Sequence, residues 1–139
     1  MIGESTIRAA VIALGVFHVA LGLLQLLAPG TFFDEIGNYG AENLHYVGDA
    51  GAFTTAYGAA LLLAARRPTW WAPILALGAI WYALHAINHL FDIDENGISD
   101  ARGILDTVLI AAGAALLAWL AHMADRLASP SNVPQTPTQ

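Results

Sequence analysis

The chain has 139 residues, of which 57% are hydrophobic and 12% charged, and its formal net charge is -6. Soluble domains carry about 25% charged residues, so this composition excludes an ordinary solvated globular surface. An acidic chain without a basic cluster repels phosphate, which excludes nucleic-acid binding. Because cysteine is absent, disulfides, thiolate nucleophiles and cysteine-based metal sites are excluded as well.

Charged residues are absent from long stretches of the chain and gather in short segments between them. A helix needs about 20 apolar residues to cross a bilayer core of about 30 Å. The pattern therefore predicts an all-α fold, a four-transmembrane-helix bundle with up-down topology. We expect the helices over residues 5–28, 43–65, 69–91 and 103–127.

Two segments outside these helices have distinct compositions. Pro29 and Gly30 end the first helix, and the polar stretch from Thr31 to Glu42 predicts a loop.

Residues 1–128 are expected to form the membrane domain. The tail 129–139 has three prolines and no apolar run, so we expect it to be disordered.

The arginines indicate the orientation of the chain. Cytoplasmic loops of membrane proteins carry an excess of basic residues. Only Arg102 falls on the acidic side of the predicted bundle, and the other four fall on the opposite side: Arg8, Arg66, Arg67 and Arg126. Both termini are therefore expected in the cytoplasm, in a multi-pass protein of the inner or plasma membrane. The lipid bilayer is the expected partner, and a homo-oligomer or a membrane-complex partner stays open.

Ionisable side chains inside membrane spans are costly, so each one suggests a function. At a rise of about 1.5 Å per residue, five of them lie near the outer ends of three spans. His18 lies deeper, near the middle of the first span, and His122 lies at the cytoplasmic end. The five outer residues are His45, Asp49, His85, His89 and Asp106.

The spacing of these residues favours metal binding. His45 and Asp49 are four residues apart, as are His85 and His89, so each pair shares one helix face. Two imidazoles at this spacing can bind one ion. If the second and third spans face each other, both pairs and Asp106 form a site for a divalent transition metal, namely Zn, Fe, Cu or Mn. The protein is then suited to redox or metal-handling work, and whether it is an enzyme stays open.

Other functions fit the same residues. A b-type haem carrier would use two axial histidines, either His45 with His89 or His18 with His85. The polar residues can also form a structural hydrogen-bond network or a proton or ion path. A structural network would suit an accessory or scaffold subunit without a cofactor.

An acidic segment precedes the fourth span. Residues 92–97 fit the opening D-x-D-x-N-G of an EF-hand calcium loop. The twelfth position of that loop requires a bidentate glutamate, and here it is Gly103. Calcium binding by residues 92–100 is therefore not expected, and a turn with Asp100 near the start of the fourth helix is the alternative.

Small residues and short internal matches predict how the helices pack. Residues 12–15 match 75–78, and residues 58–62 match 113–117, which would suit a duplicated two-helix hairpin. The second span is rich in residues that permit close helix contacts. These are Gly48, Gly51, Ala52, Gly58 and Ala59.

Two short motifs resemble those of a known family. Residues 42–52 read Glu-Asn-Leu-His-Tyr-Val-Gly-Asp-Ala-Gly-Ala, and residues 85–90 read His-Ala-Ile-Asn-His-Leu. They resemble an uncharacterised actinobacterial family of small four-helix membrane proteins, which is similar in general plan to the DoxX-like group. The resemblance covers most of residues 5–125, although Glu42-Asn43 replaces the family's Asn-Glu order. It implies the four-span topology, highlights His45, Asp49, His85 and His89, and implies no reaction.

Overall fold

The computed structural model describes residues 3–37, 41–95 and 101–129, and all regular structure in these ranges is helical. Four helices are long and apolar enough to span a membrane, consistent with a multi-pass membrane protein. The all-α prediction with four apolar spans is therefore confirmed. The elements are α1 (Glu4–Leu27), α2 (Pro29–Glu35), α3 (Leu44–Ala64), the 3-10 turn η1 (Pro68–Trp70), α4 (Trp71–Glu95) and α5 (Ala101–Ala128).

Local sequence signals explain where two of the helices begin. Proline is tolerated at the first position of a helix, and Pro29 starts α2 directly after α1 ends. The sequence predicts a loop from Thr31, whereas the structure continues this short helix to Glu35. Asn43 precedes α3 and caps it, because its Oδ1 accepts a hydrogen bond of 3.2 Å from the Tyr46 backbone N–H.

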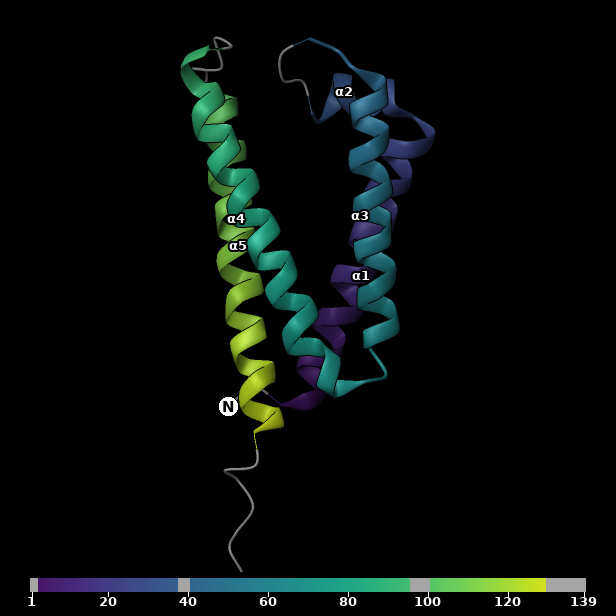
Figure 1. Ribbon diagram of the computed structural model, residues 1–139, viewed down its shortest axis with the longest axis vertical. Coiled ribbons are helices and arrows are strands. Elements are labelled where there is room, and N and C mark those ends of the chain that lie inside the picture. Colours follow the sequence, from purple (N-terminus) through teal and green to yellow (C-terminus); the bar gives the residue numbers. More distant parts are fainter. Residues whose placement is uncertain (1–2, 38–40, 96–100, 130–139) are drawn as a thin grey trace, which may run out of the picture.

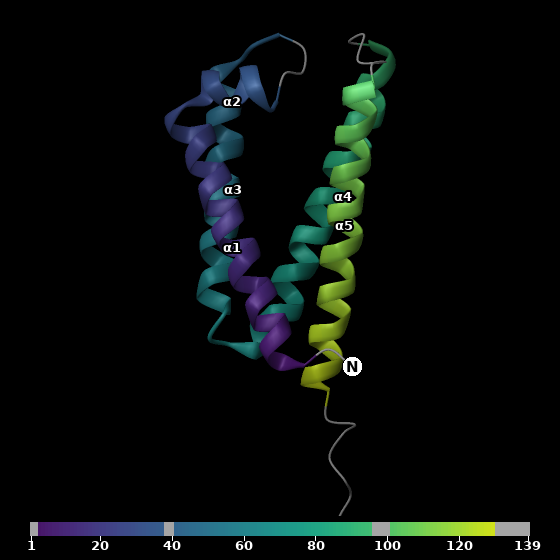
Figure 2. The ribbon, with the colours of Figure 1, turned by 180° about the vertical axis from the view of Figure 1, so that it is seen from behind.

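The four long helices form two antiparallel hairpins (Figure 1). Helix α1 lies along α3 in the first hairpin, and α4 lies along α5 in the second hairpin. The hairpins meet where α1 begins and α5 ends, which we call the closed end. They separate toward the end that carries α2, which we call the open end, and the view from behind shows the same divergence (Figure 2).

The hydrophobic core lies at the closed end, where all four long helices contribute side chains. Trp71 at the start of α4 is buried, and its Nε1–H donates a hydrogen bond of 2.8 Å to the Ala64 carbonyl of α3. The buried residues around it are Ile7, Val11, Tyr57, Leu61, Ala64, Ala65, Leu75, Leu117, Leu120, Ala121 and Ala124.

Glycines bring the two helices of the first hairpin into backbone contact. A Cβ added to Gly58 of α3 would lie 2.6 Å from the Val19 nitrogen and 2.8 Å from the Gly15 oxygen of α1. A Cβ on Gly51 would lie 2.9 Å from the Gly22 oxygen. The predicted close approach is therefore confirmed for these two glycines. It is wrong for Gly48, which has nothing within 4 Å of its Cβ position because it faces away from α1.

The glycines of the second hairpin have a different role. A Cβ added to Gly113 of α5 would lie 2.8 Å from Cδ1 of the Tyr82 ring. A Cβ added to Gly78 of α4 would overlap the Tyr57 hydroxyl group. Both glycines therefore make room for tyrosine rings, and they do not meet a facing glycine.

Candidate functional site

His85 and His89 of α4 form a close pair. Their Nε2 atoms are 2.9 Å apart, and their rings are stacked with centroids 4.7 Å apart. His89 is buried, at 8% exposure, whereas His85 is exposed. When both rings are neutral, one Nε2–H donates to the other Nε2, so only the accepting ring directs a lone pair into this contact. A metal ion bound by both Nε2 atoms would require the donating ring to carry its proton on Nδ1 instead, which frees a lone pair on each Nε2.

The second predicted pair lies on the first hairpin. His45 Nε2 and Asp49 Oδ2 of α3 are 3.5 Å apart, and their side chains are 82% and 67% exposed. The pair is thus a surface contact between successive turns of one helix. Such exposed pairs contribute little to stability.

The structure does not bring these two pairs together. Among the described residues there is no group of three or more His, Asp or Glu side chains that could hold one metal ion. The reason is the packing of the hairpins, because α3 and α4 separate toward the open end (Figure 1). The expectation that the second and third spans face each other at that end is therefore not met.

Two of the remaining predicted residues belong to α5. Asp106 is half-buried on α5, and His122 is exposed on α5 near the closed end. Residues 92–95, which supply the first positions of the predicted calcium motif, are helical and belong to α4. Residues 96–100 lie outside the described residues, as does the predicted tail from residue 130 onward.

His18 is the most enclosed ionisable side chain described, at 1% exposure. Its Nδ1 lies 2.7 Å from the Leu14 carbonyl oxygen, and its Nε2 lies 2.9 Å from the Tyr82 hydroxyl. A carbonyl oxygen only accepts hydrogen bonds, so Nδ1 carries the proton. In the neutral ring Nε2 must then accept the proton donated by the Tyr82 hydroxyl. This bond joins α1 to α4 and therefore joins the two hairpins.

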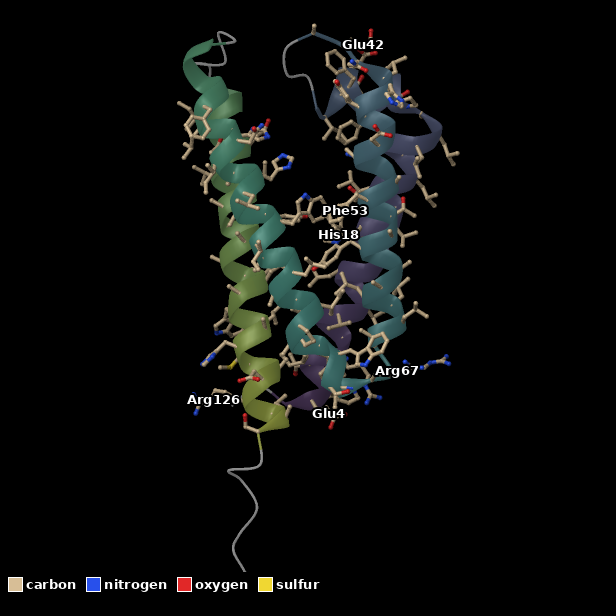
Figure 3. All side chains as sticks on the ribbon, in the orientation of Figure 1. Glu4, His18, Glu42, Phe53, Arg67 and Arg126 are labelled. Atoms are coloured by element: carbon tan, nitrogen blue, oxygen red, sulfur yellow. The ribbon has the colours of Figure 1, made fainter. Side chains whose placement is uncertain are left out.

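Aromatic rings surround His18 on both hairpins. Tyr57 packs against it edge-on with ring centroids 4.9 Å apart, and Trp81 lies at 5.9 Å. Phe53 contacts Trp81 at 4.8 Å, and Figure 3 shows His18 and Phe53 between the hairpins. The aromatic cluster fills the region where the hairpins begin to separate.

The sequence interpretation did not single out the two tyrosines that join the hairpins. Tyr82 of the second hairpin bonds His18, and Tyr57 of the first hairpin donates a hydrogen bond of 3.3 Å to the Ile74 carbonyl. A hydroxyl group inside an apolar span needs a partner. The presence of tyrosines in the middle of two spans was therefore an available signal.

Comparisons of this chain with protein-family models, curated proteins and solved structures find no match. The resemblance to small actinobacterial four-helix proteins therefore stays a prediction.

Proposed function

We propose that the protein is a multi-pass membrane protein that binds a transition-metal ion through His85 and His89. The observation that carries this proposal is the 2.9 Å separation of their Nε2 atoms on adjacent turns of α4. Imidazole nitrogens are common ligands of Zn, Cu, Fe and Ni. The site is smaller than the one expected from the sequence, because His45 and Asp49 lie on the other hairpin.

The separation of the two nitrogens favours particular metals. With metal–nitrogen bonds of about 2.05 Å, nitrogens 2.9 Å apart give a nitrogen–metal–nitrogen angle of about 90°. That angle suits the tetragonal geometry of Cu(II) or an octahedral ion. A tetrahedral Zn(II) site would need the nitrogens to move apart to about 3.3 Å. We therefore propose Cu(II) as the best-fitting ion.

The proposed orientation places both termini in the cytoplasm. The described arginine side chains support it, because Arg8, Arg66, Arg67 and Arg126 all belong to the closed end, and basic residues favour the cytoplasmic side. The histidine pair would then lie in the outer half of the membrane, where an ion from the cell exterior has the shorter path to it.

A b-type haem is the alternative cofactor. His18 fits it poorly in this conformation, because both ring nitrogens are engaged and aromatic rings enclose the side chain. Of the expected haem ligands, His45, His85 and His89 would then remain. An absorbance spectrum of the purified protein tests this alternative, because haem gives a Soret band and an imidazole-bound Cu(II) ion does not.

The test of the metal site uses the full chain in detergent, titrated with Cu(II) and with Zn(II). We expect about one Cu(II) per chain, bound more tightly than Zn(II), with an electron paramagnetic resonance spectrum showing coupling to two imidazole nitrogens. His85→Ala and His89→Ala should each weaken Cu(II) binding by about tenfold or more.

The matched controls are His45→Ala and His122→Ala, which remove exposed histidines and should leave Cu(II) binding unchanged. Equal Cu(II) binding by the His85→Ala/His89→Ala double variant and the unmodified chain would overturn the proposal. In that case the pair is a hydrogen bond within a structural network, as expected for a scaffold subunit without a cofactor.

A further inference from the structure

Two apolar grooves of similar size lie along the helices. One has a volume of about 410 Å³ and lies between α1 and α5, where it is lined by Thr6, Ala10 and Ala13 and by Leu116, Trp119 and Leu120. We call it the closed-end groove. The other has a volume of about 480 Å³ and lies between α4 and α5, where it is lined by Ala83, Ala86 and Leu90 and by Thr107, Ala111 and Ala114. We call it the second-hairpin groove.

Both grooves lie within the candidate membrane spans, and they differ in the charges near them. The closed-end groove lies at the end that carries Arg8, Arg66, Arg67 and Arg126, and Figure 3 shows Arg67 and Arg126 there. The second-hairpin groove lies at the end of α5 that carries Arg102 together with the half-buried Asp106. The two grooves therefore form a natural pair for comparison.

Arg126 is placed to act together with the closed-end groove. It is exposed in the last turn of α5, seven residues and therefore about two turns beyond Trp119, on the same helix face. Two turns correspond to about 10 Å along the helix. Trp119 is 47% exposed, and a tryptophan in this position is typical of the membrane interface.

We propose that the closed-end groove binds an acyl chain of an anionic phospholipid, whose phosphate group is bound by Arg126. An acyl chain fits an apolar groove that is open to the bilayer. The guanidinium group supplies a fixed positive charge with hydrogen-bond donors suited to a phosphate. The positive charge of Arg126 favours an anionic lipid over a neighbouring helix in the closed-end groove, because an apolar helix there would supply no anionic group to Arg126.

The experiment compares phosphatidylglycerol with phosphatidylcholine of identical acyl chains, added to the delipidated full-length protein. Retained lipid is counted by native mass spectrometry. One arginine near a membrane surface contributes about 1 kcal/mol toward anionic lipid, which corresponds to about a fivefold preference. Arg126→Gln should remove this preference, and Ala10→Phe should reduce the retention of both lipids by filling the groove.

The matched control is Ala111→Phe, which fills the second-hairpin groove and should leave the preference for phosphatidylglycerol unchanged. Because Arg126 is exposed, the Arg126→Gln variant remains informative even if Ala10→Phe fails to fold. Equal retention of the two lipids by the unmodified chain would overturn the proposal. A dimer that is lost in Ala10→Phe would also overturn it, since a second copy would then occupy the groove.

Discussion

The two hairpins use glycine in opposite ways. In the first hairpin, Gly58 lies against the backbone of α1, and a Cβ there would come within 2.8 Å of the Gly15 oxygen. In the second hairpin, Gly113 lies under the ring of Tyr82, with its Cβ position 2.8 Å from Cδ1. One set of glycines brings backbones together, and the other set accommodates side chains that join the hairpins.

This difference indicates that the two hairpins have different roles. The first hairpin is held by close backbone packing, in which a neighbouring atom cannot move without moving a helix. The second hairpin supplies Tyr82, which reaches His18, and also the His85–His89 pair. The first hairpin is therefore the more rigid unit in our interpretation, and the second carries more of the proposed chemistry.

The largest expected effect comes from adding one methyl group to the first hairpin. Gly58→Ala should lower the free energy of unfolding by about 3 kcal/mol, because its Cβ would collide with backbone atoms of Val19 and Gly15. Titration with a denaturing detergent, followed by tryptophan fluorescence, measures this change.

Gly48→Ala is the matched control on the same helix. Nothing lies within 4 Å of its Cβ position, and alanine favours a helix over glycine by about 0.5–1 kcal/mol. We expect no loss of stability for this variant. Equal losses for Gly48→Ala and Gly58→Ala would contradict the backbone packing of the first hairpin.

A smaller effect is expected at the tyrosine of the second hairpin. Tyr82→Phe removes the hydrogen bond to His18 and should cost about 1 kcal/mol, the usual range for such bonds inside a membrane. Gly113→Ala pushes the same ring aside, so it should weaken that bond as well. The two changes should therefore combine to less than their sum, by about 0.5 kcal/mol or more.

Unfolding free energies of the two single variants and the double variant give this coupling directly. Tyr46→Phe is the control, since Tyr46 is 69% exposed and should tolerate the change. Strict additivity of Tyr82→Phe and Gly113→Ala would mean that Gly113 does not position the Tyr82 ring.

The smallest effect is expected for the exposed pair of the first hairpin. His45→Ala removes a contact of 3.5 Å between largely exposed side chains, so the free energy of unfolding should change by less than about 0.5 kcal/mol. The same unfolding titration applies. A loss well above 1 kcal/mol would show that His45 contacts the second hairpin in the membrane.

The sequence was sufficient to predict the four long helices. Charge-free stretches of about 20 residues can satisfy their backbone in a bilayer only as helices, and four such helices are present. The break at Pro29 also follows from local chemistry, whereas Asn43, expected inside the second helix, precedes it as its cap. The short helix α2 was missed because seven residues are too few to show a helical pattern of apolar positions.

The arrangement of the site was beyond the sequence for a physical reason. A membrane helix is apolar on every side, so the distribution of its hydrophobic residues does not reveal which face meets another helix. The pairs His45–Asp49 and His85–His89 follow from four-residue spacing within one helix, and both contacts occur. Their relation to each other depends on how the hairpins diverge, which the spacing does not encode.

The hydrogen bonds described between the hairpins, from Trp71, Tyr57 and Tyr82, all lie at or below the level of His18. Beyond Tyr82, α4 continues for thirteen residues to Glu95, a length of about 20 Å. If α4 rotates by about 5° about Tyr82, its end at Glu95 moves by nearly 2 Å. A small change in the angle between the two hairpins therefore produces a larger displacement at the open end. The distance from His45 to His85 would report that angle sensitively.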